Sequence, residues 1–190
     1  MEQSLHSRYH RWAFAPKVLE LPVLVINSTT DKDKNQQEEE EAPHYLIPDL
    51  IHVVWLYTGD VEVWVYLHLL SMLVKQPACL LYVHSFETPI GPYWDILEST
   101  GRMRLHFWER NVSIHGIQPI ISFHKSDIIR LQALQRFGGM YLDLDIVLAR
   151  TVDPLRTNKF VLGQTGNHKD ICNAVILSTT DSEFLTRWVE

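Results

Sequence analysis

The sequence predicts an α/β domain built on a mostly parallel central sheet. From residue 47 onward, short apolar runs of strand length alternate with longer segments in which apolar residues recur at helical spacing. Strands that are joined by helices in this way lie parallel in one sheet. The chain has 190 residues, of which 46% are hydrophobic, so it is long enough to bury the core of one domain.

Composition and charge exclude several classes of protein. The formal net charge of −6 argues against a sequence-independent nucleic-acid binder, because such a protein needs a basic face. No apolar stretch of the sequence reaches membrane-spanning length, and the N-terminus lacks the apolar core of a signal peptide. Cys79 and Cys172 are too few for a disulfide scaffold, and two free thiols are favoured over a single bridge, which stays open.

The first 42 residues are predicted to be an N-terminal extension that ends in an acidic linker. The apolar run VLELPVLVI at 18–26 could form a strand. The tract STTDKDKNQQEEEEAP that follows has almost no apolar residue, so it cannot offset the entropy of becoming ordered. We therefore expect poor order in this extension and place the folded domain at residues 43–190.

In the first half of this domain, the run IPDLIHVVWL at 47–56 is rich in β-branched residues and predicts a strand. Residues 63–76 have the length and apolar spacing of a helix, and ACLLYVHS at 78–85 predicts the second strand. A short helix over 92–100 ends before a glycine, and RMRLHFWE at 102–109 predicts the third strand.

In the second half, SDIIRLQALQRF at 126–137 predicts a helix that ends at Gly138 and Gly139. The segment GGMYLDLDIVL at 138–148 predicts the fourth strand and CNAVILST at 172–179 the fifth. A final helix begins at residue 181. Because that helix is short, we expect the domain to be incomplete at its C-terminus.

Two carboxylates stand one residue apart in the fourth predicted strand. Alternation along a strand places Asp143 and Asp145 on one face with Tyr141, while Leu142 and Leu144 face the core. The two Asp Cα atoms would lie about 6.6 Å apart, so both carboxylates could sense one cation. Bound Mg²⁺ or Mn²⁺ would relieve the repulsion between them. The alternative is that the strand ends at Leu142 and both acids lie in a solvated loop.

The preceding helix carries two charged residues on its apolar stripe. At about 100° per residue, one third of its circumference holds Asp127, Arg130, Leu131, Leu134 and Phe137. Charges on a core-facing stripe are costly unless they are paired or used in function. The structural alternative is that Asp127 and Arg130 form an ion pair that caps the helix start beside Ser126.

The segment SDIIRLQALQRFGGMYLDLD at 126–145 resembles the sugar-binding region with a DXD motif of glycosyltransferase family 32. The family pattern is approximately SD-x-x-R-x-x-x-L-x-x-x-GG-x-YLD-x-D. The positions that match it are Asp127, Arg130, Leu134, Gly138, Gly139, Tyr141, Leu142, Asp143 and Asp145. Two further segments are similar to the family: IPDLIHVVWL, which contains Trp55, and CNAVILSTTDSEFL at 172–185, which contains Asn173.

The resemblance implies a GT-A-like fold, in which a mostly parallel sheet flanked by helices binds a nucleotide sugar. It implies a UDP- or GDP-sugar donor, a glycan, glycolipid or protein acceptor, retention of the anomeric configuration, and Mn²⁺ or Mg²⁺ as cofactor. We expect no nucleic-acid partner, and membrane association only through an anchor that this chain does not show.

The same resemblance assigns roles to individual residues. Asp145, with Asp143, would hold the metal ion beside the donor diphosphate, and Asp143 would also contact ribose or sugar hydroxyls. Asp127 and Arg130 would grip the transferred sugar and its phosphate side, with Arg130 opposing negative charge on the leaving group. The catalytic candidates are therefore Asp143, Asp145 and Arg130.

Three other residues complete the predicted donor contacts. Trp55 would stack on the nucleotide base, with a buried core tryptophan as the alternative. Tyr141 could supply a hydroxyl group to the donor, and Asn173 is a candidate sugar contact.

Two other functions stay open at this point. One is a haloacid-dehalogenase-type phosphotransferase, with Asp143 as nucleophile and Asp145 as general acid. The other is a catalytically silent module that binds nucleotide sugars. The family resemblance favours the Golgi lumen as the location, and otherwise the cytoplasm. Two glycosylation sequons, at Asn27 and Asn111, are compatible with the secretory lumen.

Overall fold

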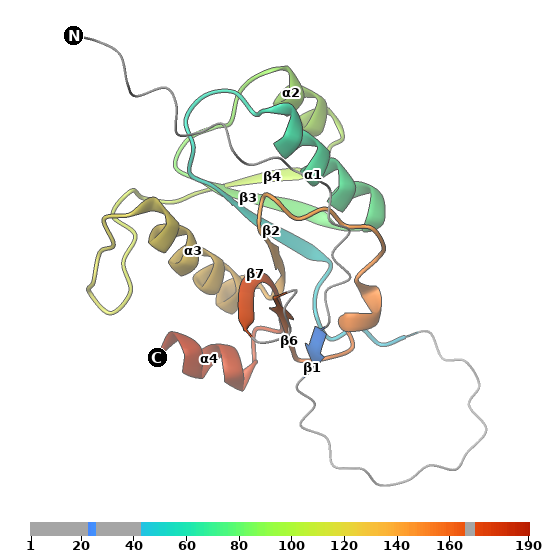
Figure 1. The fold of residues 1–190 in the computed structure, drawn as a ribbon, viewed down its shortest axis with the longest axis vertical. Coiled ribbons are helices and arrows are strands. Elements are labelled where there is room, and N and C mark those ends of the chain that lie inside the picture. Colours follow the sequence, from blue (N-terminus) through green and yellow to red (C-terminus); the bar gives the residue numbers. More distant parts are fainter. Residues whose placement is uncertain (1–22, 26–42, 166–169) are drawn as a thin grey trace, which may run out of the picture.

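The computed structural model of the protein describes residues 23–25, 43–165 and 170–190 (Figure 1). One sheet contains β1 (Val23–Val25), β2 (Leu50–Trp55), β3 (Leu80–Ser85), β4 (Met103–Phe107), β5 (Gly139–Leu142), β6 (Phe160–Gln164) and β7 (Ile171–Ser178). The helices are α1 (Val63–Lys75), α2 (Pro92–Ser99), α3 (Ser122–Phe137) and α4 (Glu183–Val189), with a 3-10 turn at Asp153–Leu155. None of the described helices is long and apolar enough to cross a bilayer.

The strand order across the sheet is β1-β6-β7-β5-β2-β3-β4. Strands β2, β3, β4 and β5 are parallel, while β7 runs antiparallel to both β5 and β6, and β1 antiparallel to β6. Five of the seven strands, β2 to β6, therefore point the same way. The prediction of an α/β fold with a mostly parallel sheet is confirmed.

Helices cover both faces of the sheet (Figure 1). On one face, α1 and α2 pack on a core that includes Ile51, Val53 and Trp55 of β2. On the other face, α3 and α4 pack on a second core that includes Val54 and Tyr141. Successive side chains of one strand thus pack on opposite faces of the sheet. Only those on the α3 face can reach a site that lies on that face.

Most predicted elements are present, and three differences matter for the site. The strand expected over 138–148 ends at Leu142, because the backbone turns at residues 144–145. Helix α3 begins at Ser122, four residues before its predicted start, so the pair Asp127–Arg130 lies inside the helix and does not cap it. Strand β6 was not predicted. Within the extension, the strand expected in 18–26 is β1, which lies before the predicted domain start.

The predicted alternation of side chains survives beyond the end of β5. Leu142 and Leu148 are buried in the core under α1, and Leu144 and Ile146 pack against the same core. The intervening acids point away from that core. The apolar alternation therefore fixes the direction of the carboxylates even where the backbone leaves the sheet. Both cysteines are free, with Cys79 buried.

A chain of hydrogen bonds crosses the sheet from β4 to the end of α3. The Trp108 indole N–H donates to His84 Nδ1 at 2.9 Å, and His84 Nε2 lies 2.9 Å from His52 Nδ1. His52 Nε2 lies 2.8 Å from the carbonyl oxygen of Gly138. Because an indole N–H only donates and a carbonyl only accepts, each imidazole must be neutral with its proton on Nε2. This relay binds the end of α3 to β2.

Burial keeps both imidazoles of the relay uncharged. It lowers the pKa of His52 to about 4 and that of His84 to about 2, because a buried cation loses its hydration. His52 and His84 are each 0% exposed. A proton added to either ring would also leave two donors facing each other along the relay.

The turn between α3 and β5 requires glycine at both positions. Gly138 and Gly139 have φ angles of 62° and 106°. A Cβ atom on Gly139 would lie 2.6 Å from the carbonyl oxygen of Leu50 and 3.1 Å from His52 Nε2. The pair lets the chain reverse directly from the helix into the strand that carries the site, with no loop between them.

The relay predicts that acid destabilises the fold. The unfolded chain binds protons on His52 and His84 below about pH 6.5, whereas the folded chain does not, so stability is complete above that pH and falls below it. We expect His52 alone to cost about 3 kcal/mol of unfolding free energy between pH 6.5 and 4. Urea unfolding across this range measures the loss. Imidazole ¹⁵N NMR of the native protein should show both rings neutral at about pH 5, and a charged ring there would contradict the assignment.

Gly139→Ala should destabilise the fold by several kcal/mol, because it adds a backbone clash to an unfavourable φ. Gly59→Ala is the matched control, since Gly59 has a φ of 95° and nothing within 4 Å of the added Cβ. The control should lose only about 1 kcal/mol. Thermal and urea unfolding of the two variants give the comparison, and equal losses would contradict the role of close approach at Gly139.

Candidate functional site

A pocket opens beyond the ends of the parallel strands β2 and β5. It has a volume of about 530 Å³ and lies between the start of α1, the first half of α3 and the turn after β5. Ligands of α/β proteins bind at this end of the sheet. The lining residues are Val54, Leu56, Tyr57, Trp64, Ser122, Phe123, Ser126, Asp127, Arg130, Tyr141, Asp143, Leu144 and Asp145.

Arg130 is the buried centre of the pocket wall. Its side chain is only 7% exposed, and its guanidinium lies 3.2 Å from Asp127 Oδ1 and 3.3 Å from Asp143 Oδ1. It also donates to the carbonyl oxygen of Asn173 at 2.7 Å and lies 4.4 Å from the centre of the Tyr141 ring. Its Nε is buried with no partner among the described residues. A cation held this deeply requires the two carboxylates beside it.

Asp143 is oriented by two contacts to the same oxygen. Tyr141 donates its hydroxyl to Asp143 Oδ1 at 2.5 Å, and Arg130 faces that oxygen as well. Burial raises the pKa of Asp143, an effect that Arg130 and the Tyr141 hydroxyl oppose. Burial also raises the pKa of Tyr141, so its hydroxyl keeps its proton and remains a donor. The other Asp143 oxygen makes no hydrogen bond or ion pair within the described part of the chain.

Asp145 is exposed at the rim of the same pocket. The turn that presents it is fixed at three points. Asp143 N–H donates to Ala174 O at 2.9 Å, Ile146 N–H to Asp143 O at 3.1 Å, and His68 Nδ1 lies 2.6 Å from Leu144 O. The solvated-loop alternative thus describes Asp145 but not Asp143, which is paired and partly buried.

The carboxylates fit a hard divalent cation. Asp145 has no hydrogen-bond or ion-pair partner in residues 43–165 and 170–190, and Asp143 offers one oxygen. Magnesium-like ions bind one or two carboxylates and complete their coordination with substrate phosphates and water. Within those same residues no group of three or more His, Cys, Asp or Glu side chains could hold a metal alone. Phosphate oxygens or water would complete the coordination of an ion held there.

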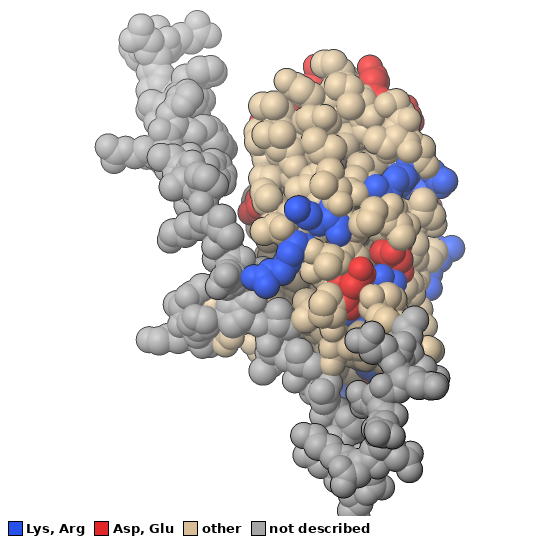
Figure 2. Space-filling view, turned by 90° about the vertical axis from the view of Figure 1, so that its right-hand side faces the viewer, with Lys and Arg blue, Asp and Glu red and all other residues tan. Residues whose placement is uncertain are grey.

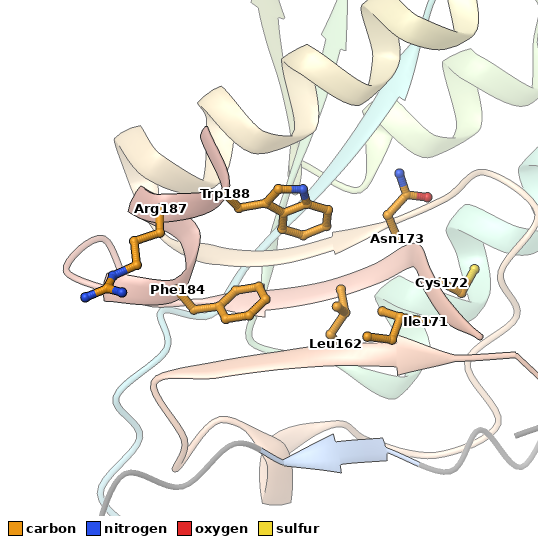
Figure 3. A pocket seen from close by; sticks show the side chains of 7 residues that line it. All are labelled: Leu162, Ile171, Cys172, Asn173, Phe184, Arg187 and Trp188. Carbon is orange, nitrogen blue, oxygen red and sulfur yellow. The ribbon is translucent and has the colours of Figure 1, made fainter. Parts of the chain in front are cut away.

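Asn173 links this pocket to a second hollow. Its side-chain amide donates to Asp127 Oδ1 at 3.0 Å, so the predicted sugar contact lies in the same cluster as Asp127 and Arg130. Asn173 also lines a hollow of about 750 Å³ between β7, β6 and α4 (Figure 3). Figure 3 shows the Trp188 ring turned toward Asn173 and the Phe184 ring turned toward Leu162, while Arg187 points away. Arg187 is held there by Glu183 at 2.6 Å.

The aromatic rings of the first pocket differ from the predicted one. Trp55 is 5% exposed and packs in the core under α1, on the opposite face of the sheet from Tyr141. The base-stacking role of Trp55 stays a prediction. The pocket itself is lined by Tyr57 and Trp64, which are 54% and 42% exposed. Both could have been found from the sequence, because Tyr57 follows β2 and Trp64 lies in the first turn of α1, at the end of the sheet where ligands of α/β proteins bind.

Lysine and arginine side chains are scattered over one face of the protein (Figure 2). On the face shown in Figure 2, the Lys and Arg side chains that are drawn in blue lie in separate groups. They do not merge into one basic surface on that face, and the expectation of no nucleic-acid partner stays a prediction.

Three comparisons relate the chain to known proteins. The family described as "Glycosyltransferase sugar-binding region containing DXD motif" matches residues 93–161. These residues include α3, β5 and the turn with Asp143 and Asp145, which we call the acidic turn. "Glucan organizing enzyme 1" of Cryptococcus neoformans is 32% identical over 164 residues, which cover 76% of this chain. The solved structure "PaToxG Glycosyltransferase" superposes with a TM-score of 0.53 at 19% identity over 75% of this chain.

The chain spans 43% of the curated relative and 58% of the solved structure. Because the sequence identity to the solved structure is low, that match shows a shared fold and nothing more. The matched region and the relative show shared sequence around the pocket.

The buried cation predicts an unequal response to mutation. Arg130→Met should lower the free energy of unfolding by roughly 2–4 kcal/mol, because it leaves Asp127 and Asp143 facing each other without a counter-charge. Adding Asp143→Asn should restore part of this loss. The matched control is Arg187→Met, whose ion pair with Glu183 is exposed and should contribute under about 1 kcal/mol. Urea unfolding measures all three, and a similar effect of Arg130→Met and Arg187→Met would contradict the analysis.

Proposed function

Because the chain carries the sugar-binding region of DXD-motif glycosyltransferases on a glycosyltransferase fold, we propose that it transfers a sugar from a nucleotide-diphosphate donor. The observation that supports this best is the cluster of Arg130, Asp127, Asp143 and Tyr141, which stands beside the exposed Asp145 in one pocket. The pocket volume of about 530 Å³ is within the range of sites that bind ligands of this size.

In this proposal the two acids of the motif have different tasks. Asp145, with the open oxygen of Asp143, would hold Mn²⁺ or Mg²⁺, and such an ion would supply positive charge to offset the charge that develops on a diphosphate leaving group. Asp143 is held in place by Tyr141 and Arg130, so it presents one fixed oxygen to ribose or sugar hydroxyls. A carboxylate held in advance loses less entropy when the donor binds.

Arg130 acts from behind the pocket wall. Its guanidinium is too buried to wrap around a phosphate, but its positive charge lies in a low-dielectric region beside the donor. Asp127 is 42% exposed and receives an amide N–H from Asn173, so this pair can contact the transferred sugar. Tyr57 and Trp64 offer exposed rings for the base or the sugar face.

The acceptor would approach from the second hollow. Asn173 lines the second hollow and donates to Asp127, which lines the first pocket, so an acceptor hydroxyl group beside Asn173 would lie near a sugar held by Asp127. The chemical nature of the acceptor, the retention of configuration and a Golgi location rest on the family resemblance alone.

The two rival functions make different use of the acids. A phosphotransferase would need Asp143 as nucleophile, and only one of its two oxygens is available for attack, because Tyr141 and Arg130 both contact Oδ1. The family match also favours the transferase over this reading. A silent binding module would keep the donor contacts but would not transfer the sugar. Only a measurement of activity, and not the geometry of the pocket, distinguishes it from the transferase.

Calorimetric titration of UDP-glucose, UDP-galactose, UDP-N-acetylglucosamine and GDP-mannose tests the proposal. We expect one nucleotide class to bind with Mn²⁺ and to lose at least about tenfold in affinity after chelation or in Asp145→Ala. Asp95→Ala on α2 is the control, because Asp95 is an exposed acid that does not line the pocket.

Two outcomes would contradict the transferase. Metal-independent binding that Asp145→Ala leaves unchanged would remove the role of the acidic turn. An aspartyl-phosphate trapped on Asp143 would favour the phosphotransferase. Slow hydrolysis of the bound donor, measured as release of free sugar, would separate an enzyme from a silent binder.

A further inference from the structure

The loop that leads into α3 and the first turn of that helix together expose four large apolar side chains within seven residues. The exposed fractions are 69% for Ile117, 95% for Ile120, 53% for Ile121 and 73% for Phe123. Single exposed apolar residues are ordinary on protein surfaces, whereas a contiguous group marks an interaction site. We call Ile117, Ile120 and Ile121 the apolar tip.

The backbone below the apolar tip is fixed. Ile114 and Ile117 pair through hydrogen bonds of 3.1 and 2.9 Å around a turn in which His115 and Gly116 have φ angles of 51° and 76°. Val112 is buried in the core under α3, and Ile114 packs against that core. The base of the loop is therefore anchored by apolar contacts while its tip faces solvent.

The loop stands at the mouth of the donor pocket. Ser122 and Phe123, which follow the apolar tip directly, line that pocket. In Figure 1 the loop, drawn in yellow before α3, extends away from the body of the domain. Whatever the tip contacts is thereby brought close to the pocket.

The charge of this segment differs from that of the whole chain. The chain carries a formal net charge of −6, yet residues 110–126 contain no Asp or Glu. They contain Arg110, His115, His124 and Lys125. Arg110 is neutralised by Glu87 at 2.9 Å, which leaves Lys125 as the cation closest to the tip in sequence. Glu109 and Asp127 flank the segment directly, so the excess of positive charge is confined to the segment itself.

We propose that the apolar tip docks on the surface of a lipid bilayer and sets the pocket mouth against it. Isoleucine and phenylalanine side chains gain free energy by leaving water for the boundary between head groups and acyl chains, and a nearby lysine favours anionic lipids. A bilayer requires no matching shape. A stable protein interface, by contrast, buries about 800 Å² per partner, which a few loop side chains do not supply.

Sedimentation with vesicles tests this docking without donor or metal, so its outcome is independent of the proposed transferase activity. We expect the full chain to bind phosphatidylcholine vesicles that contain about 30% phosphatidylserine, and to bind more weakly at high salt. The double variant Ile117→Ser/Ile120→Ser should reduce partitioning by about tenfold or more. Neither residue lines the donor pocket.

The matched control is Leu67→Ser/Val74→Ser, which removes two apolar side chains of α1 that are 53% and 60% exposed. It should bind vesicles like the native chain. Circular dichroism and thermal unfolding must show that both double variants are folded. If the tip double variant does not fold, Ile120→Ser alone provides the test, because the Ile120 side chain is 95% exposed and has few contacts to lose. The proposal is overturned if the native chain stays in the supernatant, if tip and control variants bind alike, or if the tip variant instead abolishes a dimer seen without vesicles.

Discussion

The buried charge of Arg130 is the constraint on which the rest of the site depends. A guanidinium that is 7% exposed must find counter-charges within the protein, and Asp127 and Asp143 supply them at 3.2 and 3.3 Å. Asp127 lies on the same helix as Arg130, and Asp143 lies in the turn after β5. Because both acids pair with Arg130, the cation links these two elements across the pocket. The donor contacts proposed here use side chains that this pairing has already oriented.

The fold holds those two elements in place by different means. Gly138 and Gly139 join α3 to β5 without a loop, and the His52 relay fixes the carbonyl oxygen of Gly138 against β2. Beyond β5, the backbone of the turn is held by His68, and Leu144 anchors it in the core. Hydrogen bonds and apolar burial thus both define the position of the carboxylates, which leaves Asp145 exposed on a rigid support.

Much of this arrangement follows from periodicity in the sequence. Alternating side chains predicted that Leu142, Leu144 and the acids face opposite ways, and this holds although the strand ends at Leu142. The glycine pair predicted the helix end. The features that the sequence did not predict depend on contacts with other parts of the chain. Strand β6 was not foreseen, and the loss of strand pairing after Leu142 reflects local turn hydrogen bonds that the apolar pattern does not encode.

The aromatic residues show the same limit. Alternation within β2 places Trp55 with Ile51 and Val53 on the α1 face, so its type suggested a base contact while its position serves the core. Tyr57 and Trp64 reach the pocket because they lie just outside regular strand structure, where side-chain direction is set by the loop. The face of the sheet on which a residue lies therefore decides whether it lines this pocket, and the base-stacking role of Trp55 stays a prediction.

We propose that the turn after β5, which carries Asp143 and Asp145, binds a divalent ion together with a donor diphosphate. An anomalous difference map from a crystal soaked with Mn²⁺ and the nucleotide diphosphate that binds would test this most directly. We expect a manganese peak bonded to a carboxylate oxygen of Asp145, with the diphosphate in the pocket and Arg130 still paired with Asp127 and Asp143. A peak elsewhere, or a nucleotide bound with both acids of the motif turned away from it, would exclude this role of the two acids.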